Sequence, residues 1–411
     1  MSERALLSDG RRTVNGESDG TASRPHRLAL ICDLAEEEWP SMDLVGEMLY
    51  QNLRAFHSTE FATTQVQPRM QRRWSNLPLI GRTRLAHNTD RLLNRMGDYP
   101  RYLRTRMNQF DVFHIVDHSY SHLALTLGPA RTVITCHDLN TFRCLLEPEN
   151  EPRPRWFQAV TRRILKGMTS CAHVVCVSEV VRQEILRHRL VPDARLSVVQ
   201  NAAHPSCCPL PDPDADAIAA GLLAADPGRQ TSYLLHVGST AARKRIDLVL
   251  EIFAAVRNEA PGARLVRVGG PFTAAQSLLA EKLGVAGAIQ VLPFLDRSVL
   301  AAVYRRASIL LQPSDAEGFG LPVLEALACG CPVIASDLPV LCEVGGTAAI
   351  YCPVGDIPAW TRAAVELLRE QAFGAQFFAQ RRERACEQAS FFSWAEASRK
   401  LAGVYRHVLI P

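Results

Sequence analysis

The chain has 411 residues, of which 47% are hydrophobic and 21% are charged, and its formal net charge is +4 at pH 7. These values are typical of a soluble globular protein with room for two domains, and they exclude a disordered or fibrous chain. No apolar run reaches the roughly 18 residues that a membrane-spanning helix needs, so the sequence predicts none.

The N-terminal segment, residues 1–25, is polar and has no apolar signal-peptide core, so we expect a disordered tail.

The twelve cysteines are scattered through apolar contexts without a Cys-x-x-Cys spacing. This pattern is typical of reduced, mostly buried thiols, and it favours a cytoplasmic protein.

From residue 27 onward, short apolar or β-branched runs alternate with helical patterns, which favours parallel sheets with crossover helices. In the first half the predicted strands are 27–33, 111–117, 131–138, 172–178 and 195–201. In the second half they are 232–239, 263–270, 289–294, 308–314, 331–336 and 348–353. We therefore expect an α/β protein with two Rossmann-like, doubly wound parallel-sheet domains.

The domain boundaries follow from composition. The first domain is expected over residues 26–205 and the second over 231–388, with a linker rich in Pro, Asp and Ala over 206–230. The last segment, 389–411, places Ser393 and Glu396 at capping-box spacing before an apolar pattern of helical period. We expect this helix to cross back onto the first domain.

A basic segment lies inside the first domain, where residues 69–106 hold ten arginines against two aspartates. Such a block is typical of a solvated helix face, an anionic membrane contact or a nucleic-acid patch, and the thin aromatic interleaving disfavours nucleic acid. The helix predicted over 82–96 groups its apolar residues near its arginines: Leu85, Leu92, Met96, Arg84, Arg91 and Arg95. It either packs on its own domain with a basic rim or attaches to the inner face of an anionic membrane.

The run DPDADA, residues 212–217, has the Asp-x-Asp spacing of some metal sites. It lies in the linker, not at the end of a strand, so we interpret it as solvated linker and helix start. No His/Cys cluster has metal-ligand spacing, and no Gly-x-Gly-x-x-Gly follows a strand, which disfavours a dehydrogenase. We expect neither a metal nor a cofactor.

The segment SDAEGFGLPVLEALACGCPVIAS, residues 314–336, places a Gly-x-Gly turn between a strand and a helix. Pro322 suits the first turn of that helix, and Gly330 suits a left-handed stop. The free N–H groups of Gly318 to Leu321, at the positive helix end, suit a phosphate.

Two carboxylates flank this turn. Glu317 and Glu325 suit the hydroxyls of a polyol, because each accepts hydrogen bonds from neighbouring O–H groups. A nucleotide sugar combines a diphosphate with two sugars and would use both features. The alternative is that Glu317 caps a turn and that Glu325 is a solvated helix residue.

The same segment closely resembles the E-x7-E segment of glycosyltransferase family 4, the retaining nucleotide-sugar glycosyltransferases of GT-B fold. The segments HVGSTAARKRIDLVLEIFAAV, TCHDLNTFR, VCVSEVVRQEIL, VVQNAAH and FSWAEASRKLAGVYRHVL are similar to family segments in the expected order. The resemblance covers about residues 27–408 and implies two domains facing each other across a cleft.

The resemblance implies a role for each matching residue. Glu325 would hold the ribose diol, and Glu317 would contact the transferred sugar. Arg243 and Lys244 would neutralise the diphosphate leaving group, although such a pair is also common at an exposed helix start. His137 would face the donor sugar, although an isolated histidine is more often structural. The amides presented to sugar and phosphate would be those of Gly318, Phe319, Gly320 and Leu321.

The chain departs from the family pattern in two loops. The loop after the first strand lacks the Gly-Gly pair that many members carry near the donor phosphates, and Trp39 and Ser41, two candidates for acceptor binding, stand there instead. Ser239 stands where some members have arginine. Asp117 ends the strand predicted over 111–117, and His118 and Tyr120 follow it. These three residues could line an acceptor pocket or equally serve the core.

We therefore expect a retaining hexosyltransferase of polysaccharide biosynthesis at the cell envelope. It would use a nucleoside-diphosphate sugar and a glycan or lipid-linked acceptor, with the leaving phosphate accepting the acceptor's proton. Two other functions share the donor site: a nucleotide-sugar epimerase or hydrolase of GT-B fold, and a non-catalytic nucleotide-sugar-binding subunit.

Overall fold

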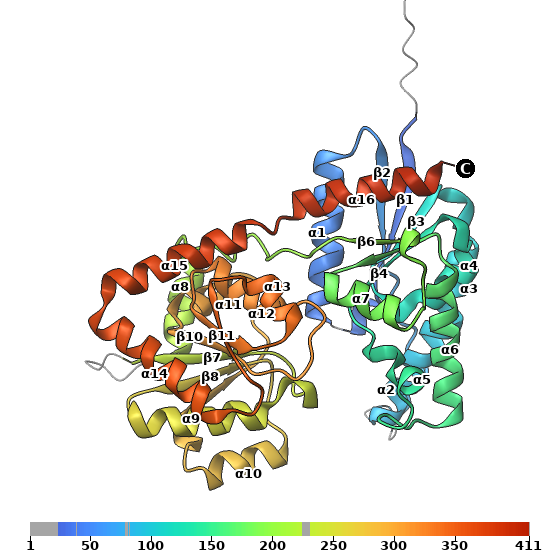
Figure 1. Ribbon diagram of the computed structural model, residues 1–411. Helices are drawn as coiled ribbons and strands as arrows, with labels where there is room; N and C mark the ends of the chain where they lie inside the picture. Colours follow the sequence, from blue (N-terminus) through green and yellow to red (C-terminus); the bar gives the residue numbers. More distant parts are fainter. Residues whose placement is uncertain (1–23, 38, 79–80, 82, 224–230, 411) are drawn as a thin grey trace, which may run out of the picture.

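The computed structural model describes residues 24–37, 39–78, 81, 83–223 and 231–410, and Figure 1 shows it as two α/β domains side by side. The tail expected over 1–25 lies outside the described residues except for its last two. Each domain is built on a six-stranded sheet in which all pairings between neighbouring strands are parallel. The predicted fold class is confirmed.

The first sheet has the strand order β2-β1-β3-β4-β5-β6. Its strands are β1 (His26–Ile31), β2 (Phe61–Val66), β3 (Val112–Ile115), β4 (Thr132–Cys136), β5 (His173–Cys176) and β6 (Leu196–Val198). The helices around it are α1 (Pro40–Phe56), α2 (Arg84–Leu93), α3 (Tyr99–Arg104), α4 (Ala124–Leu127), α5 (Arg143–Leu146), α6 (Arg155–Ser170) and α7 (Glu179–Arg187).

The second sheet has the order β12-β11-β10-β7-β8-β9. Its strands are β7 (Tyr233–Val237), β8 (Arg264–Val268), β9 (Ile289–Leu292), β10 (Ile309–Gln312), β11 (Val333–Ser336) and β12 (Ala349–Cys352). Its helices are α8 (Pro213–Leu222), α9 (Ile246–Glu259), α10 (Ala274–Lys282), α11 (Arg297–Arg306), α12 (Leu321–Ala328), α13 (Pro339–Gly345), α14 (Ile357–Phe373) and α15 (Ala375–Ser390). The chain ends with α16 (Trp394–Leu409).

The edge strand β2 was not predicted. Only its end residues, Phe61 and Val66, are buried, and the four residues between them are polar or small and at least partly exposed. An edge strand that pairs on one side needs little apolar sequence, so its pattern differs from that of the buried strands.

The helix α12 forms as predicted. Gly320 precedes it with a φ of 99°, and Gly330 follows it with a φ of 68°, two conformations that favour glycine. Val323, Leu324 and Leu327 are buried and anchor the helix in the core of the second domain.

The basic segment differs from the expectation. The helix predicted over 82–96 ends as α2 at Leu93 and continues as a π-helical turn, Asn94–Asp98. The buried side of α2 consists of Ala86 and Asp90, whereas Leu85 is 77% exposed and Leu92 is 38% exposed. Leu85 therefore points mostly to solvent, and Leu92 is only partly covered.

The C-terminal helix α16 lies against α1 and the first sheet, as Figure 1 shows at the red end of the chain. Tyr405 reaches the buried His114 of β3, whose Nδ1 is 2.6 Å from the Tyr405 hydroxyl. At the start of α16, Trp394 Nε1 donates to the Ala203 carbonyl at 2.9 Å. The second domain is thereby fastened to the first by the end of the chain.

The cysteines agree with the sequence prediction. All twelve are free, and nine of them are buried. No helix among the described residues is both long and apolar enough to span a bilayer.

Candidate active site

The second sheet reverses its strand order between β7 and β10, which are neighbours in the sheet but not in the chain. Ligands of open α/β sheets bind at such a point, outside the carboxyl ends of the strands. The segment after β7 carries Arg243 and Lys244, and the loop after β10 carries Glu317. The fold thus joins residues that are 74 and 73 positions apart in the chain.

Glu317 is a buried carboxylate held by two cations and two neutral donors. Its Oε1 accepts hydrogen bonds from Lys244 Nζ at 2.6 Å, Gln312 Nε2 at 2.7 Å and Ser314 Oγ at 2.8 Å. Its Oε2 accepts one from Arg243 Nη1 at 3.0 Å. Burial raises the pKa of Glu317, but Lys244 and Arg243 outweigh burial and lower it to about 2. The carboxylate is therefore ionised at neutral pH.

The loop that leads into α12 offers free backbone donors. The N–H groups of Gly318, Phe319, Gly320 and Leu321 make no hydrogen bond within the described part of the chain. They lie at the positive end of the helix dipole, where an anion is stabilised.

Gly318 lies directly against the first domain. A Cβ atom on Gly318 would be 1.8 Å from the His137 carbonyl oxygen, so a larger residue would force the domains apart. The Gly318 carbonyl accepts a hydrogen bond from Ser178 Oγ at 2.9 Å, and the same Oγ accepts from Val181 N at the start of α7. Sequence reasoning did not assign Ser178 to the site, although its place before an amphipathic helix marks it as a helix cap.

Glu325 has different surroundings from Glu317. It is half-buried on α12 and accepts a hydrogen bond from the Tyr304 hydroxyl of α11 at 3.0 Å. Burial raises its pKa to about 7, against the opposing effects of Tyr304 and Arg297. Two carboxylates eight positions apart in one motif thus differ in charge near neutral pH.

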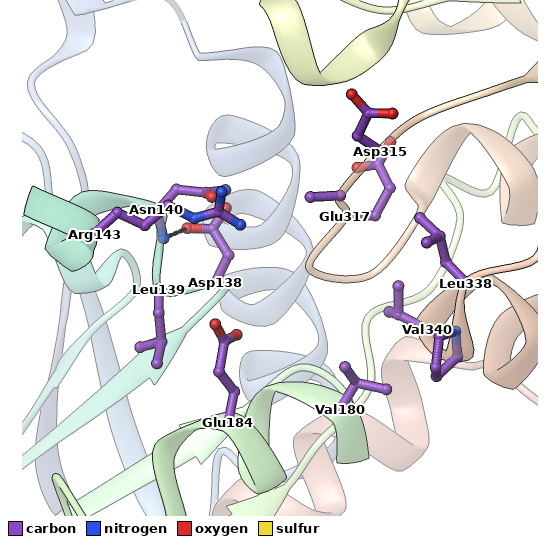
Figure 2. A pocket seen from close by; sticks show the side chains of 12 residues that line it. Asp138, Leu139, Asn140, Arg143, Val180, Glu184, Asp315, Glu317, Leu338 and Val340 are labelled. Carbon is purple, nitrogen blue, oxygen red and sulfur yellow. Dashed lines mark hydrogen bonds between the residues drawn. The ribbon is translucent and has the colours of Figure 1, made fainter. Parts of the chain in front are cut away.

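A pocket with a volume of about 160 Å³ lies between the two domains. The first domain contributes Asp138, Leu139, Asn140, Arg143, Val180 and Glu184, and the second contributes Asp315, Ala316, Glu317, Leu338, Pro339 and Val340. In Figure 2, Asp138, Arg143 and Glu184 stand on one side of the pocket, and Asp315 and Glu317 stand on the other. Charged groups from both domains therefore face the same space.

The first sheet reverses its order between β1 and β3, and a buried polar cluster occupies that point. It contains Asp117, His118 and Tyr120, the three residues considered for the acceptor. Asp117 accepts from the Ser119 N–H at 2.8 Å, and Tyr120 OH accepts from the Leu34 N–H at 3.2 Å. His118 Nε2 is 3.2 Å from Thr141 Oγ1.

Asp33, which follows β1, belongs to the same cluster but was not predicted to be a site residue. Its Oδ2 is buried and has no hydrogen-bond partner among the described residues. Burial and the nearby Asp117 raise the pKa of Asp33 well above its usual range, while Asp117 stays below its own usual range, against burial, because of His118 and His137. Its position at the end of the first predicted strand, 27–33, was the available signal in the sequence.

The other predicted first-domain residues lie outside the pocket lining. His137 is buried with its Nε2 2.8 Å from the Val116 carbonyl oxygen. Its backbone, not its imidazole, therefore contacts Gly318 in the loop that leads into α12. Trp39 precedes α1 and donates from Nε1 to Glu37 at 3.2 Å, under the guanidinium of Arg91. Ser41 is exposed in the first turn of α1.

The Asp-x-Asp run acts locally. Asp212 caps α8 by accepting from the Ala215 N–H at 3.2 Å, and Asp216 pairs with Arg305 at 3.2 Å. The interpretation as a helix start is confirmed, but Asp216 is part of an ion pair and is not freely solvated. Among the described residues, no group of three or more His, Cys, Asp or Glu side chains is placed to hold a metal ion.

Family comparisons match both halves of the chain. Residues 47–206 match the model described as glycosyltransferase family 4, and residues 227–389 match the model described as glycosyl transferases group 1. The first match ends in the loop that follows β6, and the second covers the loops that carry Arg243, Lys244 and Glu317.

Individual proteins are similar to the chain at lower identity. The O-antigen chain mannosyltransferase B of Escherichia coli is 26% identical over 279 residues, covering 67% of this chain and 70% of that protein. The D-inositol 3-phosphate glycosyltransferase of Mycobacterium avium (strain 104) is 34% identical over 182 residues, covering 42% of this chain and 41% of that protein. The match to this second relative therefore spans about two fifths of its length.

Among solved structures, HepE of Anabaena in complex with UDP-glucose superimposes with a TM-score of 0.66 at 14% identity, covering 93% of this chain and 100% of that chain. At this level of identity, the likeness describes the fold.

Proposed function

Because the chain belongs to glycosyltransferase family 4, the group 1 glycosyltransferases of GT-B fold, we propose that it is a retaining hexosyltransferase. The donor is a nucleoside-diphosphate hexose, and the acceptor is a hydroxyl of a glycan or lipid-linked glycan of the cell envelope. The O-antigen mannosyltransferase relative supports this acceptor class, and the UDP-glucose complex of HepE supports the donor class. The reaction needs neither a metal nor a cofactor.

The observation that carries the proposal is the ion cluster of Glu317, Arg243 and Lys244 at the order reversal of the second sheet. Departure of a nucleoside diphosphate leaves negative charge on the β-phosphate, and two cations fixed at that point stabilise it. The N–H groups at the start of α12 add further donors to the same anion.

Glu317 is poorly suited to act as a nucleophile. Both of its carboxylate oxygens accept charge-assisted hydrogen bonds, and a carboxylate with a pKa of about 2 is a weak base. This supports attack of the acceptor from the face that the leaving diphosphate vacates, with a phosphate oxygen accepting the proton. Glu317 then accepts hydrogen bonds from the hydroxyls of the transferred sugar.

Glu325 is assigned to the ribose diol. It lies one turn into α12, so a diphosphate at the start of this helix places the ribose within reach of its carboxylate. The acceptor is assigned to the first domain, where Asp117, His118 and Tyr120 gather at the matching end of the sheet.

Nucleotide release from a panel of nucleotide sugars, with and without membrane extract, tests the proposal. We expect release with one donor, strongly stimulated by an acceptor from the extract, and retention of anomeric configuration in the product by NMR. Release that needs no acceptor would indicate a hydrolase, and conversion of the donor into its epimer without net release would indicate an epimerase. Binding without release would indicate a non-catalytic subunit.

Chelation tests the absence of a metal requirement. Because Arg243 and Lys244 carry the charge that a divalent ion would otherwise supply, turnover is expected to be unchanged in EDTA. Activity lost in EDTA and restored by manganese would contradict this part of the proposal.

We also propose that the basic segment attaches the first domain to an anionic membrane. Its exposed surface combines the apolar Leu85 and Trp74 with the exposed Arg72 and Arg84. Arg91 forms an ion pair with Glu37 instead. Each basic residue near an anionic surface contributes about 1 kcal/mol, and apolar side chains add their burial in the interface. Such attachment brings the pocket close to a lipid-linked acceptor.

Co-sedimentation with vesicles of increasing phosphatidylglycerol content measures this attachment. Binding should rise with anionic lipid and fall steeply with salt, because exposed charges are screened within about 10 Å at 0.1 M. Leu85→Ser with Arg84→Ser should weaken it, whereas Arg362→Ser on the exposed side of α14 should not. Equal binding to neutral vesicles, or none at low salt, would contradict the proposal.

A further inference from the structure

A cation is buried beneath the loops that follow β7 and β8. Arg267 lies in β8, is 1% exposed and forms no ion pair with a carboxylate among the described residues. A buried charge without a counter-charge is costly, so it persists where other groups compensate for it. The compensation here comes from the backbone.

The guanidinium of Arg267 binds three backbone carbonyls at the tips of two strands. Its Nη2 donates to the Gly238 carbonyl at 3.1 Å and to the Gly269 carbonyl at 3.4 Å, and its Nη1 donates to the Gly270 carbonyl. The ring of Phe272 lies 5.5 Å from the guanidinium carbon. One side chain thus joins the end of β7 to the loop after β8.

These two loops touch backbone against backbone. A Cβ on Gly269, where φ is 128°, would be 2.0 Å from the Gly238 carbonyl oxygen, so the contact requires glycine. Gly238 N also donates to the Val268 carbonyl at 3.0 Å, and Gly269 N donates to the Leu292 carbonyl at 3.2 Å. The tips of β7, β8 and β9 therefore form one rigid unit above Arg267.

The Gly238 carbonyl, one of the three that Arg267 binds, belongs to the same peptide group as the Ser239 N–H. In a trans peptide the C=O and N–H groups point in opposite directions, so the Ser239 N–H points away from the guanidinium. That N–H has no hydrogen-bond partner among the described residues. Lys244 passes the same peptide, because its Cδ is 3.7 Å from the position of a Cβ on Gly238.

The charges around this peptide do not balance. Three cations, Arg243, Lys244 and Arg267, stand against Glu317. The adjacent Arg245 pairs with both Asp247 and Asp315, so these seven groups together leave a net positive charge. His236 of β7 is buried beside Lys244 and Arg267, and burial followed by these two cations lowers its pKa to about 3, so it is neutral at pH 7. A nucleoside diphosphate carries at least two negative charges and would be attracted to this positive cluster.

We propose that Arg267 is a positioning residue for the donor diphosphate, holding the Gly238–Ser239 peptide so that its N–H faces the phosphates and adding its own charge from below. This inference rests on the proposed function, because it needs a nucleoside diphosphate in the second domain. Ser239 itself supplies no charge, so the charge beneath its peptide comes from Arg267 on the neighbouring strand β8.

Calorimetry with UDP, GDP and their nucleosides tests the proposal on purified wild-type protein and on Arg267→Met and Arg267→Lys. Loss of a charge-assisted contact should weaken nucleoside diphosphate binding by about 10- to 100-fold in Arg267→Met. Nucleoside binding should change by less than about threefold, and Arg267→Lys should recover part of the loss because it restores the charge. In turnover assays the donor KM of Arg267→Met should rise.

Arg264→Met is the matched control, because Arg264 begins the same strand at the far end from the pocket and is only half-buried. It should bind diphosphates like the wild type. An equal loss for nucleoside and nucleoside diphosphate, or no loss in Arg267→Met, would overturn the proposal while leaving the function intact. If Arg267→Met does not fold, Arg267→Lys must still show a loss confined to the diphosphate. A wild type that binds no nucleoside diphosphate would overturn the proposed function as well.

Discussion

Glu317 and Glu325 occupy one short motif, yet their neighbours give them opposite protonation behaviour. Arg243 and Lys244 keep Glu317 ionised, whereas Glu325 accepts a hydrogen bond from the neutral Tyr304 hydroxyl and has a raised pKa. The motif itself predicted that both residues belong to a site. It did not predict their difference, because the partners come from other strands and helices of the fold.

Glu317→Gln should lower stability in a pH-dependent way. The folded-state pKa of about 2 lies below the ordinary 4.5, so the carboxylate stabilises the fold above pH 4.5 and loses this effect as the pH falls toward 2. Urea unfolding should show a variant less stable by about 1–3 kcal/mol at pH 7, with the difference shrinking below pH 4.5. Asp315→Asn, which removes an exposed ion pair with Arg245, should change stability by at most about 1 kcal/mol.

Glu325→Gln should have the opposite effect on stability. The folded-state pKa of about 7 lies above the ordinary 4.5, so the ionised carboxylate destabilises the fold increasingly between pH 4.5 and 7. The variant should therefore gain up to about 1–3 kcal/mol over wild type at pH 8 and little at pH 4, as measured by urea unfolding. It should also bind donor more weakly, since a carboxylate accepts stronger hydrogen bonds than an amide. A variant that is less stable at pH 8 would contradict the burial argument.

At the scale of elements, the buried strands and α12 were predictable because periodicity and glycine position report burial and turns directly. β2 was not, since an edge strand needs apolar residues only at Phe61 and Val66. The packing of α2 was not predictable either. Its buried Asp90 accepts hydrogen bonds from the N–H groups of residues 73–75, so the buried side of the helix is polar where the sequence pattern favoured the leucines. Contacts between segments far apart in the chain leave no local pattern in either segment.

Ser178 caps α7 and also donates to the Gly318 carbonyl in the loop that leads into α12, so Ser178→Ala should weaken both contacts. Losing the cap costs about 1 kcal/mol, and the Gly318 carbonyl loses a donor, which adds about 1–2 kcal/mol. Thermal unfolding should show the lower stability, and calorimetry should show weaker donor binding. Thr273→Ala removes an exposed cap on α10 and should lower stability by a similar cap contribution while leaving donor binding unchanged. Equal donor affinity in both variants would separate Ser178 from the site.

At the scale of the whole molecule, polar contacts hold the two domains together around the pocket. Glu343 of α13 accepts from the Glu179 N–H at 3.1 Å and from Gln200 Nε2 at 2.8 Å. Farther along the interface, Arg297 of α11 pairs with Glu47 of α1. Each of these contacts depends on one carboxylate, so we expect single substitutions to weaken the contact between the domains.

Glu343→Ala should favour a more open molecule. A carboxylate at the start of α7 contributes about 0.5–2 kcal/mol to closure, and its loss moves the population toward separated domains. Small-angle X-ray scattering without donor should show a larger radius of gyration than for wild type, and saturating donor should reduce the difference. Glu366→Ala, on the exposed side of α14, should scatter like wild type. An unchanged radius of gyration in Glu343→Ala would show that closure does not depend on this contact.

The return of α16 to the first domain has a consequence for motion. The chain crosses between the domains twice, once after β6 and once between α15 and α16, and Figure 1 shows both crossings in the upper part of the view. Two fixed crossings define an axis, so we expect the domains to move relative to each other mainly by a hinge rotation about the line through these crossings. Displacement in such a rotation grows with distance from the axis. The part of the molecule near α2 and α10, far from both crossings, should therefore open the widest and admit the larger substrate.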